Sequence, residues 1–248
     1  MEALDQFFDY EVSGDLALFT TPNSKVSGDK TSYKVPTYQS LIGLTEAIYW
    51  KPTIAYRIEK VRIMNRIRQE EINMLIPDIA SWKKSRAIYS YLKDVRYQVR
   101  VHMMWNPEHP ELKADRDPIK HVACFRKYLK SGGRWNPYLG TSECKALVRP
   151  CVFGTGTSYY DNSGKINEGI MYHSLVYPDA MADDIKPFVG AGKNIGMIIS
   201  DEVAMENGVI HFRTLKEIPS IYYNFTEFFT KPKKEYKRRK NLKPVEKE

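Results

Sequence analysis

The sequence has few cysteines and no long apolar run, and both absences narrow what it can be. Its three cysteines, Cys124, Cys144 and Cys151, form no CxxC pair, which disfavours a disulfide framework and a zinc site. No apolar run approaches the roughly 18 residues of a membrane span. The acidic start, "MEALDQFFDYEV", also lacks the pattern of a secretory signal. These features predict a globular, cytoplasmic protein.

Motifs for nucleotide or metal chemistry are missing or incomplete. The glycine-rich stretch from Phe188 to Gly196 fits neither the Rossmann nor the Walker spacing, which favours a structural turn. His121 and Cys124 lie three residues apart, as metal ligands can, but no second ligand pair is evident. The segment "PDAMADD" indicates an acidic loop rather than a magnesium site, and no GxSxG motif occurs. We therefore expect no metal ion and no cofactor.

Positive charge is concentrated at the end of the chain. The 248 residues carry a formal net charge of +8. Lys231 to Glu248 hold nine basic and three acidic residues, which leaves only +2 for the other 230 residues. This basic tail, which we predict to be flexible, suits either a nucleic-acid contact or a solubilising end.

A second basic region follows a pattern of alternating residues. Between Trp82 and His102 there are six basic residues and one aspartate, and from Val95 onward apolar residues alternate with polar or basic ones. Period two predicts a strand with one apolar and one basic face, which suits either solvent or a polyanion. The residues that we consider for RNA binding are Arg68, Lys83, Lys84, Arg86, Arg96 and Arg100.

The order of predicted elements indicates an α+β fold. We expect a strand at 7–20, a helix at 37–50 capped by Thr37, strands at 54–64 and 95–104, and a helix at 117–131. Downstream, "YYDNSGKI" predicts a hairpin turn, and "NIGMIIS" and "GVIHFRTL" predict short strands. A ferredoxin-like domain over 1–185, a small C-terminal β-sheet over 186–230 and the tail from 231 fit this order.

The helix at 117–131 carries the clearest chemical candidates. Asp117 is its expected cap, and Ile119, Val122, Phe125 and Leu129 have the spacing of a buried stripe. Lys120 and His121 stand in the first turn, off that stripe, where helix N–H groups favour a phosphate. A lysine adds a cation and a histidine can transfer protons near neutral pH. Such a pair suits metal-free phosphodiester cleavage, although a surface lysine beside a histidine is the commoner case.

Several motifs together resemble one known family. They are "YEVSGDLALFTTP", "TSYKVPTYQSLIGLTEAIYWKP", "IRQEEI", "DPIKHVACF", "NPYLG", "NIGMIISD" and "NGVIHF", in this order over about residues 7–215. The sequence resembles the type I-C (Dvulg subtype) CRISPR-associated proteins of the RAMP superfamily, the fifth Cas family. "EAIYWKP" combined with a later "KH" is specific to this family.

The resemblance implies a ferredoxin-like (RRM-like) RAMP fold with a small C-terminal antiparallel β-sheet. It implies an endoribonuclease that cuts CRISPR repeat RNA at the base of its stem-loop, leaving a 2′,3′-cyclic phosphate and a 5′-hydroxyl. The enzyme would then stay on the 5′ handle within the Cascade complex, beside backbone and large subunits. The family's catalytic residues fall on Tyr49, Lys120 and His121. The alternative is a non-catalytic RNA-binding subunit of such a complex.

Overall fold

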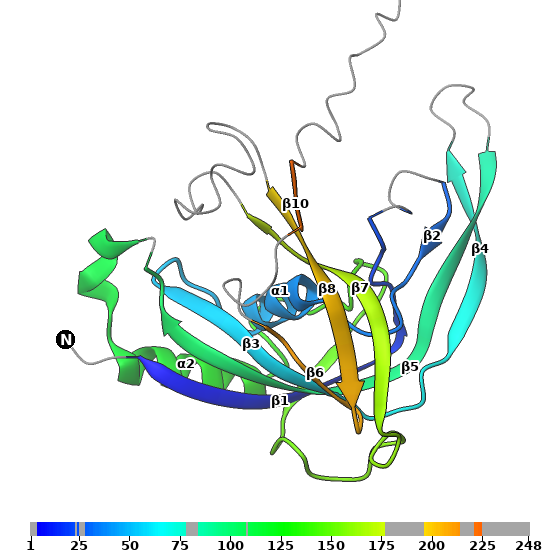
Figure 1. Ribbon diagram of the computed structural model, residues 1–248. Helices are drawn as coiled ribbons and strands as arrows, with labels where there is room; N and C mark the ends of the chain where they lie inside the picture. Colours follow the sequence, from blue (N-terminus) through cyan, green and yellow to red (C-terminus); the bar gives the residue numbers. More distant parts are fainter. Residues whose placement is uncertain are drawn as a thin grey trace, which may run out of the picture.

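A curled, mostly antiparallel sheet dominates the fold (Figure 1). The structure, a computed structural model, describes residues 4–22, 24, 28–77, 84–107, 109–176, 196–213 and 221–224. Within these ranges the strands are β1 (Asp5–Ala17), β2 (Lys30–Thr31), β3 (Ile54–Ile63), β4 (Gln69–Pro77), β5 (Lys84–Trp105), β6 (Leu147–Pro150), β7 (Lys165–Val176), β8 (Gly196–Glu206), β9 (Val209–His211) and β10 (Ile221–Asn224). The helices are α1 (Tyr38–Ile48), the 3-10 helix η2 (Pro110–Asp115) and α2 (Pro118–Lys130).

The long strand β5 is the centre of the sheet. Its 22 residues pair with β1, β3 and β4 antiparallel and with β2 in parallel. The strand β9 pairs with both β3 and β8, so the C-terminal strands continue the same hydrogen-bonded sheet. The order along its main path is β10-β8-β9-β3-β5-β1-β6.

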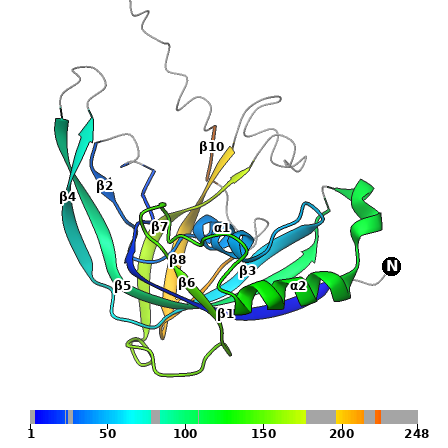
Figure 2. The same ribbon diagram turned by 180° about the vertical axis from the view of Figure 1, so that it is seen from behind.

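Both α-helices pack on one face of this sheet, because the apolar residues of β1 alternate toward them. Phe8 contacts Phe125 of α2 with ring centres 4.3 Å apart. Two residues further, the Tyr10 hydroxyl lies 2.8 Å from the Thr45 hydroxyl of α1. Figure 2 shows α2 lying along β1, and Figure 1 shows α1 within the curve of the sheet. The end of α1 and the start of α2 come together on this face.

Most predicted elements are confirmed, with shifted ends. The mixed α and β composition holds, and the strand at 7–20 and the helices at 37–50 and 117–131 correspond to β1, α1 and α2. The predicted hairpin at "YYDNSGKI" is wrong in its pairing, since it is a turn before β7, which pairs with β8. The strand at "GVIHFRTL" is reduced to the three residues of β9. The ferredoxin-like arrangement remains a prediction.

The predicted domain division near residue 185 falls in 177–195, outside the described residues. The glycine-rich loop, the acidic "PDAMADD" segment and the tail from 231 lie outside them as well. These predictions therefore stay predictions.

Candidate active site

Tyr49 lies where α1 ends. Thr37 begins the helix by accepting the Ser40 N–H at 3.3 Å, and the apolar side of α1 is buried on the sheet. Tyr49 is the C-terminal cap in an extended conformation, with its N–H donating to the Thr45 carbonyl. The Tyr56 hydroxyl of β3 donates to the Tyr49 carbonyl at 2.6 Å. The cap and this bond fix the direction in which the Tyr49 ring leaves the helix.

Lys120 and His121 lie in the first turn of α2. The Asp117 carboxylate accepts the Lys120 N–H at 3.2 Å, and Pro118 occupies the first helical position. His121 is fully buried, whereas the Lys120 side chain is 48 % exposed. The two neighbours therefore face different environments.

The buried stripe of α2 differs from the predicted one. His121, Phe125 and Leu129 are the buried residues, at spacings of four, while Ile119 is 79 % exposed. The prediction that His121 stands off the stripe is wrong, because α2 turns that residue toward the end of α1. The stripe was assigned from apolar residues alone, and a histidine was not counted as one of its members.

Tyr49 and His121 form a hydrogen bond across 72 residues of sequence. The Tyr49 hydroxyl lies 2.9 Å from His121 Nδ1. His121 Nε2 lies 2.8 Å from the Asp115 carbonyl oxygen, which can only accept. In the neutral ring Nε2 thus carries the proton, and Nδ1 accepts the proton of the tyrosine hydroxyl. The structure brings the predicted tyrosine and histidine into direct contact.

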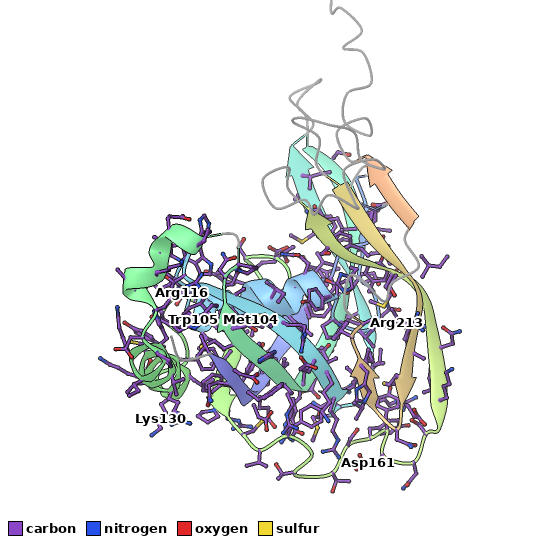
Figure 3. The ribbon with its side chains drawn as sticks, turned by 60° about the vertical axis from the view of Figure 1, so that its left-hand side comes forward. Met104, Trp105, Arg116, Lys130, Asp161 and Arg213 are labelled. Carbon is purple, nitrogen blue, oxygen red and sulfur yellow. The ribbon has the colours of Figure 1, made fainter. Side chains whose placement is uncertain are left out.

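Aromatic rings enclose this pair. Tyr128 of α2 stacks on Tyr49 with ring centres 5.8 Å apart, and the edge of Trp105 meets His121 at 5.6 Å. Arg116 lies beside Trp105, its guanidinium carbon 5.9 Å from the ring centre (Figure 3). Burial raises the pKa of the Tyr49 hydroxyl well above its usual value, and nearby Cys124 and Asp115 raise it further. Tyr49 is therefore protonated at neutral pH and is a hydrogen-bond donor, not a base.

Asp115 links the lysine, the histidine and the end of η2. Its carboxylate lies 2.5 Å from Lys120 Nζ, accepts the Thr53 hydroxyl at 2.8 Å, and lies 3.6 Å from His121 Nε2. The hydrogen bond from Lys120 lowers the pKa of Asp115, and the same contact raises the pKa of Lys120. An anion thus lies among three donor groups, at the N-terminus of a helix. The sequence interpretation missed both Asp115 and Thr53.

The arginines proposed for RNA binding do not join this site. Arg100 pairs with Asp9 at 2.7 Å and Arg96 with Glu11 at 2.8 Å, on the sheet face opposite the helices. Arg68 pairs with Asp94 at 2.6 Å. Carboxylates of the same sheet thereby neutralise much of the positive charge of the predicted basic face. The structure places Arg86 on the β4–β5 hairpin, while Lys83 and the Lys84 side chain are not described. Their roles remain predictions.

The described residues hold no candidate metal site and no candidate membrane-spanning helix. Within that part of the chain, no group of three or more His, Cys, Asp or Glu side chains is placed to hold a metal ion. No helix among the described residues is long and apolar enough to span a membrane.

Comparison with known proteins identifies the family. The family described as CRISPR-associated protein (Cas_Cas5) matches residues 8–213, most of the chain. The chain belongs to this family. Within it, a protein named CRISPR pre-crRNA endoribonuclease Cas5d from Thermus thermophilus is 32% identical over 150 residues. One of the same name from Mannheimia succiniciproducens is 30% identical over 156 residues.

The matched stretches are shorter than these two Cas5 relatives. They cover 56% of this chain and 62% of the Thermus protein, and 54% of this chain and 67% of the Mannheimia protein. Two solved structures are similar over nearly their whole length. A CRISPR-associated protein has a TM-score of 0.70 at 33% identity, with 88% of this chain and 96% of its own chain covered. The functionally uncharacterized SMU1763c from Streptococcus mutans has a TM-score of 0.69 at 34% identity, with 88% and 97% covered.

Proposed function

We propose that this Cas5 protein cuts CRISPR repeat RNA at the base of its stem-loop without a metal ion. The 2′-hydroxyl would attack the neighbouring phosphorus, and the bond to the 5′ oxygen would break, leaving a 2′,3′-cyclic phosphate and a 5′-hydroxyl. The protein would then stay on the 5′ handle as a Cascade subunit with the backbone and large subunits. A ferredoxin-like body and a cytoplasmic location belong to the same proposal. The names of the two curated relatives support an RNA-cutting role.

One observation carries the proposal. The hydrogen bond between Tyr49 and His121 joins the end of one helix to the start of another, with Lys120 in the same turn. Cleavage of RNA by its own 2′-hydroxyl needs a group that takes a proton, a group that gives one, and a cation for the crowded phosphate. A tyrosine and a histidine can take and give protons, and a lysine supplies the cation, so Tyr49, His121 and Lys120 can fill these three roles.

The geometry suggests how the proton would move. Since Tyr49 stays protonated, it can accept the 2′-hydroxyl proton only while passing its own to His121 Nδ1. His121 would thus hold the proton, with its Nε2–H kept in place by the Asp115 carbonyl. The proton would then return from His121 Nδ1 to the Tyr49 oxygen, while the Tyr49 hydroxyl gives its own proton to the leaving 5′ oxygen. In this mechanism Tyr49 and His121 act as one unit.

The position of Asp115 suggests where the phosphate would bind. Its carboxylate accepts from Lys120 and Thr53, two donors that a phosphodiester could use, and lies 3.6 Å from His121 Nε2. Because Lys120 is half exposed, the phosphate would meet this side chain first. The phosphate would replace the Asp115 carboxylate on Lys120.

Replacement of Asp115 by asparagine should tighten RNA binding. The variant keeps the backbone carbonyl that accepts from His121 but removes the charge that competes with phosphate. An ion pair as exposed as Asp115–Lys120 is weak in water, so we expect affinity to rise by about fivefold at most. Filter binding or fluorescence anisotropy with repeat RNA measures it. Glu111→Gln removes a charge from the same 3-10 helix away from Lys120 and should change affinity less; equal or weaker binding of Asp115→Asn would contradict this role.

Truncation after Thr230 should weaken the salt dependence of RNA binding. The tail holds +6 of the net charge of +8. Each phosphate neutralised on single-stranded RNA contributes about −0.7 to the slope of log affinity against log salt. The truncated protein should show a shallower slope while cutting at the same bond. Binding at several salt concentrations measures this, and identical slopes for the two forms would show that the tail does not contact RNA.

A second function has one observation in its favour. His121 is fully buried and both of its ring nitrogens are hydrogen-bonded, as in a structural histidine. The chain would then be an RNA-binding subunit that does not cut. Incubating the purified protein with the repeat RNA of its own array separates the two: cutting supports the enzyme, and binding of intact RNA supports the subunit.

A further inference from the structure

A groove of about 860 Å³ runs along α1, and none of Tyr49, Lys120 and His121 lines it. Its walls include the exposed side of α1, residues 18–20 just after β1 and the segment 136–141. Eight of its lining side chains are uncharged and can form hydrogen bonds: Thr20, Thr37, Gln39, Ser40, Asn136, Tyr138, Thr141 and Tyr172. The proposed mechanism makes no use of this groove.

The chemistry of the groove differs from that of the rest of the surface. Among the described residues that line it none is Asp or Glu, although the chain has 30 of these residues, and Lys30 is the charged side chain in the lining. Amide and hydroxyl groups match the uncharged donors and acceptors on the edges of nucleobases. Tyr138, which is 36 % exposed, offers a ring on which a base can stack.

The groove is continuous with the end of α1 that carries Tyr49. Ala47 lines it, and the Ala47 carbonyl accepts the Trp135 N–H at 3.0 Å. Gly133, at φ +120, turns the chain toward this carbonyl; a Cβ there would lie 2.7 Å from the Trp135 carbonyl. Trp135 is 47 % exposed, and the Arg134 guanidinium lies 4.5 Å from its ring centre. An exposed ring and a cation thus lie at the end of α1, where Ala47 lines the groove and Tyr49 follows two residues later.

We propose that this groove binds unpaired nucleotides of the RNA next to the scissile phosphate, with Trp135 and Arg134 at its catalytic end. This proposal rests on the proposed function, since it requires an RNA bound at Tyr49, Lys120 and His121. Aromatic rings beside a cation bind single-stranded RNA by stacking. A basic peptide is the less fitting occupant, because the described lining of the groove offers no carboxylate to pair with it. The groove would set which bond lies at the catalytic residues.

Gly43 allows a direct test, because it faces the groove from the middle of α1. A Cβ added at Gly43 would meet no atom within 4 Å, so this position has room for a side chain, and Gly43→Phe adds a ring at the groove. Both this variant and its parent should carry His121→Ala, so that binding is measured without cutting. We expect about tenfold weaker binding of repeat RNA that has unpaired flanks. Asn162→Phe adds the same ring in the exposed turn before β7 and should leave affinity unchanged.

An RNA without its unpaired flank shows whether the weaker binding of Gly43→Phe comes from lost contacts to that flank. An RNA that keeps the stem and the scissile nucleotides but lacks the unpaired flank should bind Gly43→Phe and its parent equally. A second variant, Gln39→Ala with Asn136→Ala, should weaken binding of the flanked RNA only. Equal affinity of Gly43→Phe and its parent for the flanked RNA would overturn the proposal, as would an equal loss with both RNAs. Unchanged RNA binding with loss of a co-purified protein would assign the groove to a protein partner. Since binding is measured in an uncut background, failure of the catalytic proposal would be seen separately.

Discussion

Alanine at His121 is expected to slow RNA cleavage on the order of a hundredfold or more. The change removes Nδ1, to which the Tyr49 hydroxyl is hydrogen-bonded. The Tyr49 hydroxyl, whose pKa is raised, then has no imidazole beside it to accept its proton. Lys120→Ala should slow cleavage to a similar extent, because it removes the cation that would face the phosphate in the proposed mechanism. Single-turnover cleavage of repeat RNA measures both rates. RNA binding should change far less, because phosphate contacts elsewhere contribute to affinity.

Two further variants guard against misreading a folding defect. His121 is fully buried, so its loss also removes packing, whereas Tyr49→Phe keeps the ring and its stacking on Tyr128 and removes only the hydroxyl. It should lose activity while its thermal stability falls less than that of His121→Ala, because only one buried hydrogen bond is removed. Lys127→Ala removes an exposed lysine from the last turn of α2 and should cut normally. If His121→Ala and Lys120→Ala cut at the wild-type rate, the active site lies elsewhere.

Local sequence patterns predicted the two helices that hold the site. The caps Thr37 and Asp117 are both observed, with hydrogen bonds to the backbone N–H groups of Ser40 and Lys120. Capping and helical spacing depend on neighbours in sequence, so the sequence alone reveals them. The link between Tyr49 and the second helix spans 72 residues, and no local pattern contains it. Only the family resemblance indicated that Tyr49 and His121 belong to the same site.

The contacts around Asp115 show what sequence reasoning could not supply. Thr53 and Asp115 lie 62 residues apart and meet because β3 starts beside the end of η2. Each looks like an ordinary loop residue in the sequence. An acidic residue shortly before a lysine and histidine was a signal that could have suggested an ion pair, but it would not have shown which oxygen meets which donor.

The sequence predicted the alternating faces of the basic strand correctly, but it did not reveal the carboxylates that pair with its arginines. The alternation from Val95 is the period of β5, but the register with β1 places Asp9 directly opposite Arg100. Strand pairing is a tertiary property, so the neutralising carboxylate was invisible from the one strand. The first half of β5 and all of β4 were also missed, because Glu70, Glu71 and the basic residues near 84 hide the alternation of Ile72, Met74 and Ile76.

The central claim is that the RNA's own 2′-hydroxyl is the nucleophile, and a single 2′-deoxy substitution tests it most directly. Purified wild-type protein is incubated in excess EDTA with repeat RNA, unmodified or 2′-deoxy at the scissile nucleotide, and the product ends are mapped. The unmodified RNA should be cut once, with a 2′,3′-cyclic phosphate and a 5′-hydroxyl, because Tyr49, Lys120 and His121 supply the chemistry. The 2′-deoxy RNA should remain intact, while the same substitution one nucleotide away should have no effect. Cutting of the scissile 2′-deoxy RNA, or complete loss of cutting in EDTA, would contradict the account.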